Sequence, residues 1–409
     1  METRTSPRLV AGLALAVGLL CGLLAWRWSW FIDLRVYELG AGALFGGDLY
    51  GVRFHVADLP FTYPPFAAVL MLPLAVLPIW LSAFVWAAAC VVVLAYAVDL
   101  VLRACGAAPK GLLIPAVVAA ALVSEPVWST FSFGQVNLFL MAAILADVLR
   151  PDRKHAGWLV GIVAGIKLTP LFFVAFLIVI GRRRAAGTAV AAFAGTVLVG
   201  AVAAPSASWA YWTEVLWDPG RVGGVEYAGN QSVLGVLSRL LGHEAPTSLW
   251  FVVAGTTAVV ALASARLLWR SGSPAARPLA ACAASYGMLL ASPISWDHHW
   301  VWLVPTVIAL WHSGLPRARP LAVIVAAVAS SRAIWWSPFR YGREYDWSLA
   351  EGIAGNAYVL TALGLLGSCA WWGLRARRAP DDPGPDEPGS DGSEPDDSGV
   401  RRGLRRLLA

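Results

Sequence analysis

Apolar segments long enough to cross a lipid bilayer recur along most of this chain. A hydrocarbon core of ~30 Å requires about 20 apolar residues in a helix, and such runs extend from residue 9 to residue 373. Of the 409 residues, 58% are hydrophobic and 14% are charged, whereas soluble domains are about half apolar and a quarter charged. Because lipid cannot satisfy backbone polar groups, these runs should be helices. The sequence therefore predicts an all-α integral membrane protein.

The basic residues, mostly Arg in short runs between apolar segments, predict the topology. They place the N-terminus in the cytoplasm, and no cleavage site follows the first run, which we expect to remain as a helix. Counting 157–181 as one helix gives about twelve crossings, with both termini cytoplasmic. One cluster, "RPDRKH" at 150–155, would then lie outside, unless part of 111–137 dips into the membrane and returns. The expected crossings are 9–26, 64–79, 82–102, 111–127, 137–150, 157–181, 187–205, 247–270, 278–293, 296–312, 320–337 and 353–373.

Two segments differ in composition from the predicted crossings. Residues 31–62 form a mixed outer loop whose helical spacing predicts short helices on the membrane surface. Residues 376–409 are rich in Pro, Gly, Asp and Ser, so we expect a disordered cytoplasmic tail. We therefore expect one polytopic domain over 1–375.

Several classes of site are not indicated. The five Cys lie in or beside apolar runs without metal-ligand spacing, so neither a disulfide framework nor a zinc site is predicted. No P-loop, G-x-G-x-x-G or D-x-D motif occurs in the body of the chain, which argues against a cytosolic nucleotide donor. We predict no cofactor and no metal, and the basic runs are better explained by membrane topology than by nucleic acid.

Asp33 and Lys167 stand out by position. Asp33 follows the first helix, where it is either an N-cap or a carboxylate that removes a proton from a bound hydroxyl. Lys167, in "AGIKLTP", lies deep in an apolar run, so it must snorkel, pair or face a polar cavity. Thr169 and Pro170 favour a helix break beside it. An anionic partner for Lys167 is expected.

The stretch "SPISWDHHWVW" places Asp297, His298 and His299 between two apolar runs. Adjacent helical positions point about 100° apart, so the two His should play unequal parts, and neither a regular helix nor a known His spacing suits one metal ion. They are either caps in a polar network or donors to a phosphate oxygen. A helical face shared with Trp302 favours His298. Trp296 belongs to an aromatic belt at the membrane surface or stacks on a sugar.

Two amide-rich motifs, "FGQVN" and "GNQS", suit sugar hydroxyls, because an amide both donates and accepts. They suit helix ends and polar loops equally well. The four residues proposed from them for substrate binding are Gln135, Asn137, Asn230 and Gln231.

Taken together, the motifs resemble a known family. "DLRVYELGAGALFGGDLY", "LPFTYPPFAAVLMLPLAVLP", "SFGQVN", "AGIKLTP", "GNQSVLGVLSR" and "SPISWDHHWVWLVP" occur in the order typical of actinobacterial polyprenyl-phosphate-mannose-dependent α-(1→2)-mannosyltransferases, glycosyltransferase family 87. The resemblance implies a GT-C bundle in the plasma membrane, with the active site facing outward. It implies an inverting transfer of mannose from a polyprenyl-phosphate-mannose donor to a mannosylated lipid or glycan acceptor.

The resemblance also implies roles for individual residues. Asp33 takes the place of the catalytic base, and His298 or His299 that of a further active-site residue. Arg35, Tyr37 and Tyr63, in the first two motifs, are expected to contact substrate, as is Asp297, which stands where relatives often carry another residue. A transporter or flippase of an anionic lipid-linked substrate is the alternative, but the chain shows no inverted repeat.

Overall fold

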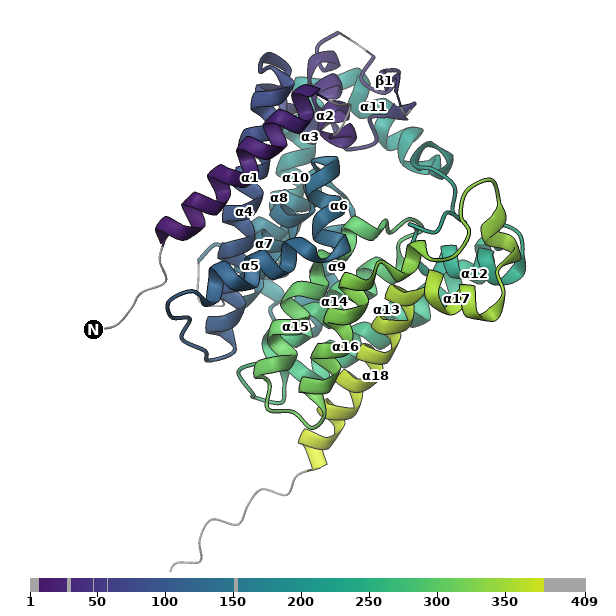
Figure 1. Cartoon of the computed structure of the whole chain (residues 1–409). Helices are drawn as coiled ribbons and strands as arrows, with labels where there is room; N and C mark the ends of the chain where they lie inside the picture. The colour runs from purple at the N-terminus through teal and green to yellow at the C-terminus, as the bar shows by residue number, and fades with distance from the viewer. Residues whose placement is uncertain (1–6, 28–30, 47, 57, 151–153, 379–409) are drawn as a thin grey trace, which may run out of the picture.

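Helices form almost all the regular structure of the residues that the structure, a computed structural model, describes: 7–27, 31–46, 48–56, 58–150 and 154–378 (Figure 1). The α-helices are α1 (Pro7–Arg27), α2 (Ile32–Ala43), α3 (Pro65–Leu70), α4 (Ile79–Ala104), α5 (Leu113–Val123), α6 (Glu125–Phe133), α7 (Asn137–Leu149), α8 (Trp158–Ile166), α9 (Phe172–Val179), α10 (Arg183–Ala203), α11 (Pro205–Thr213), α12 (Val233–Leu241), α13 (Thr247–Trp269), α14 (Ala276–Ala291), α15 (Leu303–His312), α16 (Ala318–Ser331), α17 (Leu349–Gly355) and α18 (Ala357–Arg378). The 3₁₀ helices are η1 (Leu72–Val76), η2 (Thr169–Leu171), η3 (Val215–Trp217), η4 (Pro219–Val222), η5 (Asp297–Trp302), η6 (Ala333–Trp335) and η7 (Arg343–Asp346).

Six helices of the described chain are long and apolar enough to cross a membrane, and the bent pair α5–α6 would make a seventh. The expectation of a helical multi-pass membrane protein is thus supported, but the count of twelve crossings is not confirmed. The remaining predicted crossings correspond to helices that are shorter or broken. The six are α1, α4, α10, α13, α16 together with η6, and α18.

The predicted crossing at 64–79 is wrong. This segment folds into the short helix α3 and the 3₁₀ helix η1, neither long enough to span. Proline is the reason, because it removes backbone donors and ends helices, and the segment contains Pro64, Pro65, Pro73 and Pro78. α4 then packs antiparallel to α1, with Gly22 beside Trp80 and Gly18 beside Phe84.

The predicted single helix at 157–181 is also wrong. The helix α8 ends at Ile166, just before Lys167, and the chain then reverses direction through η2 and α9. α8 runs parallel to α10, since Gly157 lies against Ala185 and Gly165 against Thr196. α10 begins almost where α8 began, so α8 and α9 form a hairpin with Lys167 near its tip.

These two changes place the basic clusters together at one end of the bundle, which we call the arginine end. The Arg182 side chain donates to Val148 O at 2.6 Å and lies over the Trp269 ring at 4.6 Å. Arg150, from the cluster that the predicted topology placed outside, lies over Tyr96 of α4. Arg150 and Arg182 therefore lie at the same end of the bundle.

The opposite end, which we call the α2 end, carries α2, α3, α11 and the hairpin β1 (Arg53–Phe54) with β2 (Leu59–Pro60), in antiparallel register Arg53↔Pro60. The outer loop expected at 31–62 thus contains one clear helix and a two-stranded hairpin. α14 lies in the core, and every residue from Pro278 to Leu290 is buried. It delivers the chain to η5 at the α2 end. The tail predicted at 376–409 lies outside the described residues from 379 onward.

Candidate active site

The start of α2 is fixed against the end of α6. The Phe31 N–H donates to Ser132 O at 3.1 Å, and Phe31 has a left-handed backbone with φ 64°. Gly134 ends α6 with φ 74°, and a Cβ there would lie 2.6 Å from Leu34 Cβ. Asp33 is in the first turn of α2 and is not its N-cap, which leaves its carboxylate available for other contacts.

A hydrogen-bonded group of side chains orients the Asp33 carboxylate. Gln135 Oε1 accepts from the hydroxyls of Tyr37 at 2.9 Å and Tyr63 at 3.4 Å, and the two hydroxyls lie 3.0 Å apart. With its oxygen occupied, the Gln135 amide nitrogen is left to donate to Asp33, with which it forms a side-chain hydrogen bond. The structure therefore joins four residues that the sequence analysis named separately.

Burial raises the pKa of the Asp33 carboxyl above its ordinary value. The nearby His298 and Lys167 side chains, together with the Gln135 hydrogen bond, oppose that rise. A carboxylate with a raised pKa is a stronger base than one in water.

η5 positions the two histidines differently. Its backbone is held at His298 O, which accepts from Thr130 Oγ1 at 3.1 Å and Asn137 Nδ2 at 3.0 Å. The His298 ring is 5% exposed, meets Phe133 edge-on and has Nδ1 3.6 Å from Asp297 Oδ1. Among the described residues neither His298 ring nitrogen has a hydrogen-bond partner, and neither does Asp297 Oδ2. These buried polar atoms are suited to contact a substrate.

His299, not His298, contacts Lys167. Its Nε2 lies 2.6 Å from Lys167 Nζ, and its Nδ1 accepts from the Trp296 N–H at 3.1 Å. Burial lowers the pKa of His299 well below its usual value, so the ring is neutral near pH 7. Because Nδ1 accepts, the ring hydrogen belongs on Nε2, on the side of Lys167. Across the 2.6 Å contact the Nε2–H donates to Nζ, so Nζ accepts it as an amine and keeps its own N–H groups for an anionic oxygen.

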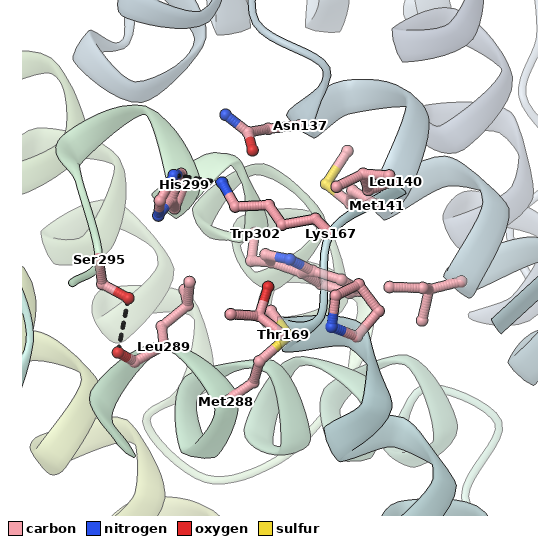
Figure 2. A pocket seen from close by; sticks show the side chains of 12 residues that line it. Asn137, Leu140, Met141, Lys167, Thr169, Met288, Leu289, Ser295, His299 and Trp302 are labelled. Carbon is pink, nitrogen blue, oxygen red and sulfur yellow. Dashed lines mark hydrogen bonds between the residues drawn. The ribbon is translucent and has the colours of Figure 1, made fainter. Parts of the chain in front are cut away.

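A small cavity adjoins this pair (Figure 2). Figure 2 shows the Lys167 side chain pointing toward His299, above Thr169 and Met288. The cavity has a volume of about 20 Å³, which is enough for a single water molecule. Most of the other residues that line it are apolar, among them Leu140, Met141, Ile144, Leu289 and Trp302.

Asn230 and Gln231, two of the residues proposed for substrate contact, use their side chains to bind backbone atoms. Both side chains are fully buried. The Asn230 amide nitrogen donates to Val225 O and Pro293 O, and its oxygen accepts from the Ser295 N–H. The Gln231 amide nitrogen donates to Ala228 O and Gly355 O. Asn230 thereby contacts the loop before η5, and Gln231 contacts the end of α17. Trp296 packs edge-on against Tyr227, and Arg35 is half-buried on α2.

A charged group that was not predicted from the sequence lies beside the cluster. Glu125, buried at the start of α6, has Oε2 2.7 Å from Arg332 Nε, and its Oε1 accepts from Trp335 Nε1 at 2.9 Å. The signal was present in the sequence, because Glu125 is an acidic residue inside the apolar run 111–127, where charge is costly without a partner.

The cluster combines a buried carboxylate with nitrogen-bearing side chains. No three His, Cys, Asp or Glu side chains in the described ranges are grouped to hold a metal ion. A carboxylate facing amine and imidazole donors suits attack by a hydroxyl with departure of an anionic group.

Comparisons with known proteins agree with this chemistry. The chain is 39% identical to the polyprenol-phosphate-mannose-dependent alpha-(1-2)-phosphatidylinositol pentamannoside mannosyltransferase of Mycobacterium tuberculosis, over 75% of this chain and 72% of that protein. It is 33% identical to the polyprenol-phosphate-mannose-dependent alpha-(1-2)-phosphatidylinositol mannoside mannosyltransferase of Mycolicibacterium smegmatis, over 90% of this chain and 92% of that protein.

No solved structure matches the fold significantly. Residues 61–293 match glycosyltransferase family 87. That range contains Lys167 and Gln135, and the match to the Mycolicibacterium smegmatis relative covers 90% of the chain. On these grounds the chain belongs to glycosyltransferase family 87 and is a glycosyltransferase.

Proposed function

We propose that this protein transfers mannose from polyprenol-phosphate-mannose to a phosphatidylinositol mannoside or a related mannosylated acceptor, forming an α-(1→2) linkage. The names of its relatives support the donor, the acceptor class and the linkage. The observation that carries the proposal is the meeting of Asp33, from α2, with the Lys167–His299 pair, from the α8–α9 hairpin and η5. One side of the site can accept a proton while the other receives a phosphate.

The reaction is a single displacement at the anomeric carbon of mannose. The acceptor hydroxyl oxygen forms a bond to that carbon, and the bond from the carbon to the phosphate oxygen breaks. The hydroxyl proton goes to the Asp33 carboxylate, and polyprenyl phosphate leaves with the bonding electrons. A β-linked donor gives an α-linked product by inversion.

The growing charge on the phosphate is the part of the transition state that Lys167 and His299 stabilise. Donors placed where charge develops accelerate the chemical step more than they strengthen ground-state binding. His298 lies close enough to Asp33 to favour its ionised form. Gln135, held by Tyr37 and Tyr63, keeps the carboxylate oriented. No cofactor or metal takes part in the proposed reaction.

We further propose that the site opens to the outer face of the plasma membrane and that both termini are cytoplasmic. The gathering of Arg150, Arg182 and Arg277 at the arginine end supports this orientation, because cytoplasmic ends carry excess Arg and Lys. The site lies at the α2 end and would then face outward.

A direct transfer assay tests the proposal. Purified protein in lipid nanodiscs is given polyprenol-phosphate-[¹⁴C]mannose and a phosphatidylinositol mannoside, and the product linkage is established with an α-(1→2)-specific mannosidase. We expect a labelled acceptor from which the mannosidase releases the labelled mannose. Labelled product that resists the mannosidase would refute the linkage, and no product from correctly folded protein would refute the proposed donor or acceptor.

A further inference from the structure

A second polar surface of the α2 end has no part in the chemistry described above. The loop between η6 and α17 forms an open groove of about 670 Å³, lined by residues 336–341 and Arg343. Its side chains combine guanidinium groups with exposed aromatic rings.

The groove is built by a strained but firmly held turn. Arg340, Tyr341 and Gly342 all have left-handed backbones, with φ of 72°, 57° and 75°, and this conformation is costly for residues with a Cβ. Buried Glu344 holds the turn by accepting from the Arg340 N–H at 2.8 Å. Arg343 Nη2 donates to Phe339 O at 3.0 Å. Backbone strain of this kind persists where surrounding contacts impose it and often marks a functional surface.

The turn displays large side chains to the exterior. Tyr341 is 96% exposed and Trp336 is 69% exposed. Each guanidinium has five N–H donors; Arg343 uses one of them on Phe339 O, and Arg340 forms a side-chain hydrogen bond with Tyr227. Several donors therefore remain for a ligand, and guanidinium matches the geometry of a phosphate.

The position of the loop puts it at the surface of the bilayer. It joins the candidate span Ala318–Trp335 to the candidate span Ala357–Ala376, so it cannot lie far from the lipid headgroups. Tyr and Trp favour that depth. The groove is also connected to the active site, because Phe339 packs on Trp335 at 5.3 Å and Trp335 donates to Glu125.

We propose that this groove binds the phosphodiester of the lipid acceptor, with Arg340 and Arg343 holding the phosphate and Trp336 and Tyr341 lying among the headgroups. This inference rests on the proposed function for the identity of the acceptor. It explains how a membrane-bound acceptor is held while its sugar reaches Asp33: the lipid phosphate is fixed at the rim and the glycan extends inward.

The test compares two acceptors that differ in the phosphate. The double variant Arg340→Gln with Arg343→Gln is assayed with a phosphatidylinositol mannoside and with an alkyl α-mannoside that has no phosphate. We expect the KM for the phosphorylated acceptor to rise by roughly 10-fold, as loss of hydrogen bonds to a charged group predicts, with kcat unchanged. The KM for the alkyl mannoside should not change. Arg53→Gln is the matched control, because Arg53 is an exposed Arg on the same end, in β1.

The outcomes separate this inference from the proposed function. Equal KM changes for both acceptors, or no change for either, would overturn the phosphate site. If the wild-type protein transfers no mannose, the proposed function fails and the groove is tested by native mass spectrometry with phosphatidylinositol and diacylglycerol. A preference of the wild-type protein for phosphatidylinositol that the double variant loses supports the groove as a phosphate site, and the absence of that preference refutes it.

Discussion

At the scale of single residues, Asp33 illustrates how a fold changes the chemistry of a side chain. Its position after the first helix suggested either a cap or a base, and the structure places it in the first turn of α2 with Gln135 as its hydrogen-bond partner. Burial raises its pKa, which makes it a better proton acceptor while requiring that it be ionised to act.

Replacing Asp33 by Asn should lower transfer by about 10²–10⁴-fold, the usual effect of losing a general base, with donor binding nearly intact. In the wild-type protein only the ionised carboxylate accepts a proton. Activity is therefore expected to be present above the raised pKa of Asp33 and to be lost as pH falls through it, at a pH above the ordinary Asp range. Initial rates against pH measure this. Asp33→Asn activity within a few-fold of wild type would exclude Asp33 as the base.

The Lys167–His299 pair should act as one unit. Lys167→Gln and His299→Gln are each expected to lower kcat/KM for the lipid-linked substrate by about 10²-fold, since the first removes the amine that faces the leaving phosphate and the second removes the imidazole that holds this amine in place. Lys167 Nζ and His299 Nε2 are 2.6 Å apart. The loss of transition-state stabilisation in the double variant should therefore be much smaller than the sum of the losses in the two single variants. His312→Gln, at an exposed site in α15, is the control. Strict additivity would show that the two residues act separately.

At the scale of elements, the site depends on short, broken helices. α5 and α6 meet at an 80° bend, and α6 then crosses the α2 end and meets both α2 and η5. The α8–α9 hairpin ends at Lys167 instead of spanning. Breaks such as these free backbone groups, which is tolerated within a membrane only where protein surrounds them or water reaches them. The broken elements thus bring polar side chains to one place.

Gly134→Ala tests the junction of α6 with α2. The new methyl group would lie 2.6 Å from Leu34 Cβ, next to Asp33 in sequence, so α2 must shift. A displacement of about 1 Å at the reacting groups can cost on the order of 10²-fold in rate, and we expect a fall in kcat of that order. The positive φ adds a loss of stability of about 1 kcal/mol.

Gly314→Ala is the matched control for that experiment, because Gly314 has a φ of 67° and no neighbour within 4 Å of an added Cβ. It should show the loss of stability, measured as a lower Tm in detergent, without the loss of kcat. If the two variants lose kcat equally, the contact with Leu34 does not position the site.

At the scale of the whole molecule, the two ends of the bundle differ in their polar residues. Arg150, Arg182 and Arg277 lie at the arginine end, and the polar side chains of the site lie at the α2 end. This arrangement fits the positive-inside rule when 64–79, which folds as α3 and η1, is not counted as a crossing.

Cysteine labelling tests this topology directly. In a Cys105→Ser background, whose remaining Cys are buried, single cysteines are introduced at His155, His312 and Tyr341, all exposed. A membrane-impermeant maleimide applied to intact cells should label position 341 alone, and positions 155 and 312 only after the membrane is opened. Labelling of positions 155 and 341 from the same side would contradict this topology and support a crossing at 64–79.

The sequence by itself determined the membrane class, because hydropathy over a helix-length window reflects a local cost of transfer into lipid. It also made Lys167 and the His pair candidates for the site, since charged groups in apolar runs are costly without a partner. Spacing along one chain did not decide which His meets Lys167, because that depends on where η5 lies against the hairpin tip. It also could not show that Asn230 and Gln231 bind backbone, since amides serve sugars and loops alike. Those choices, and the pairing of Glu125 with Arg332, were made by tertiary packing, which brings together residues that are far apart in sequence.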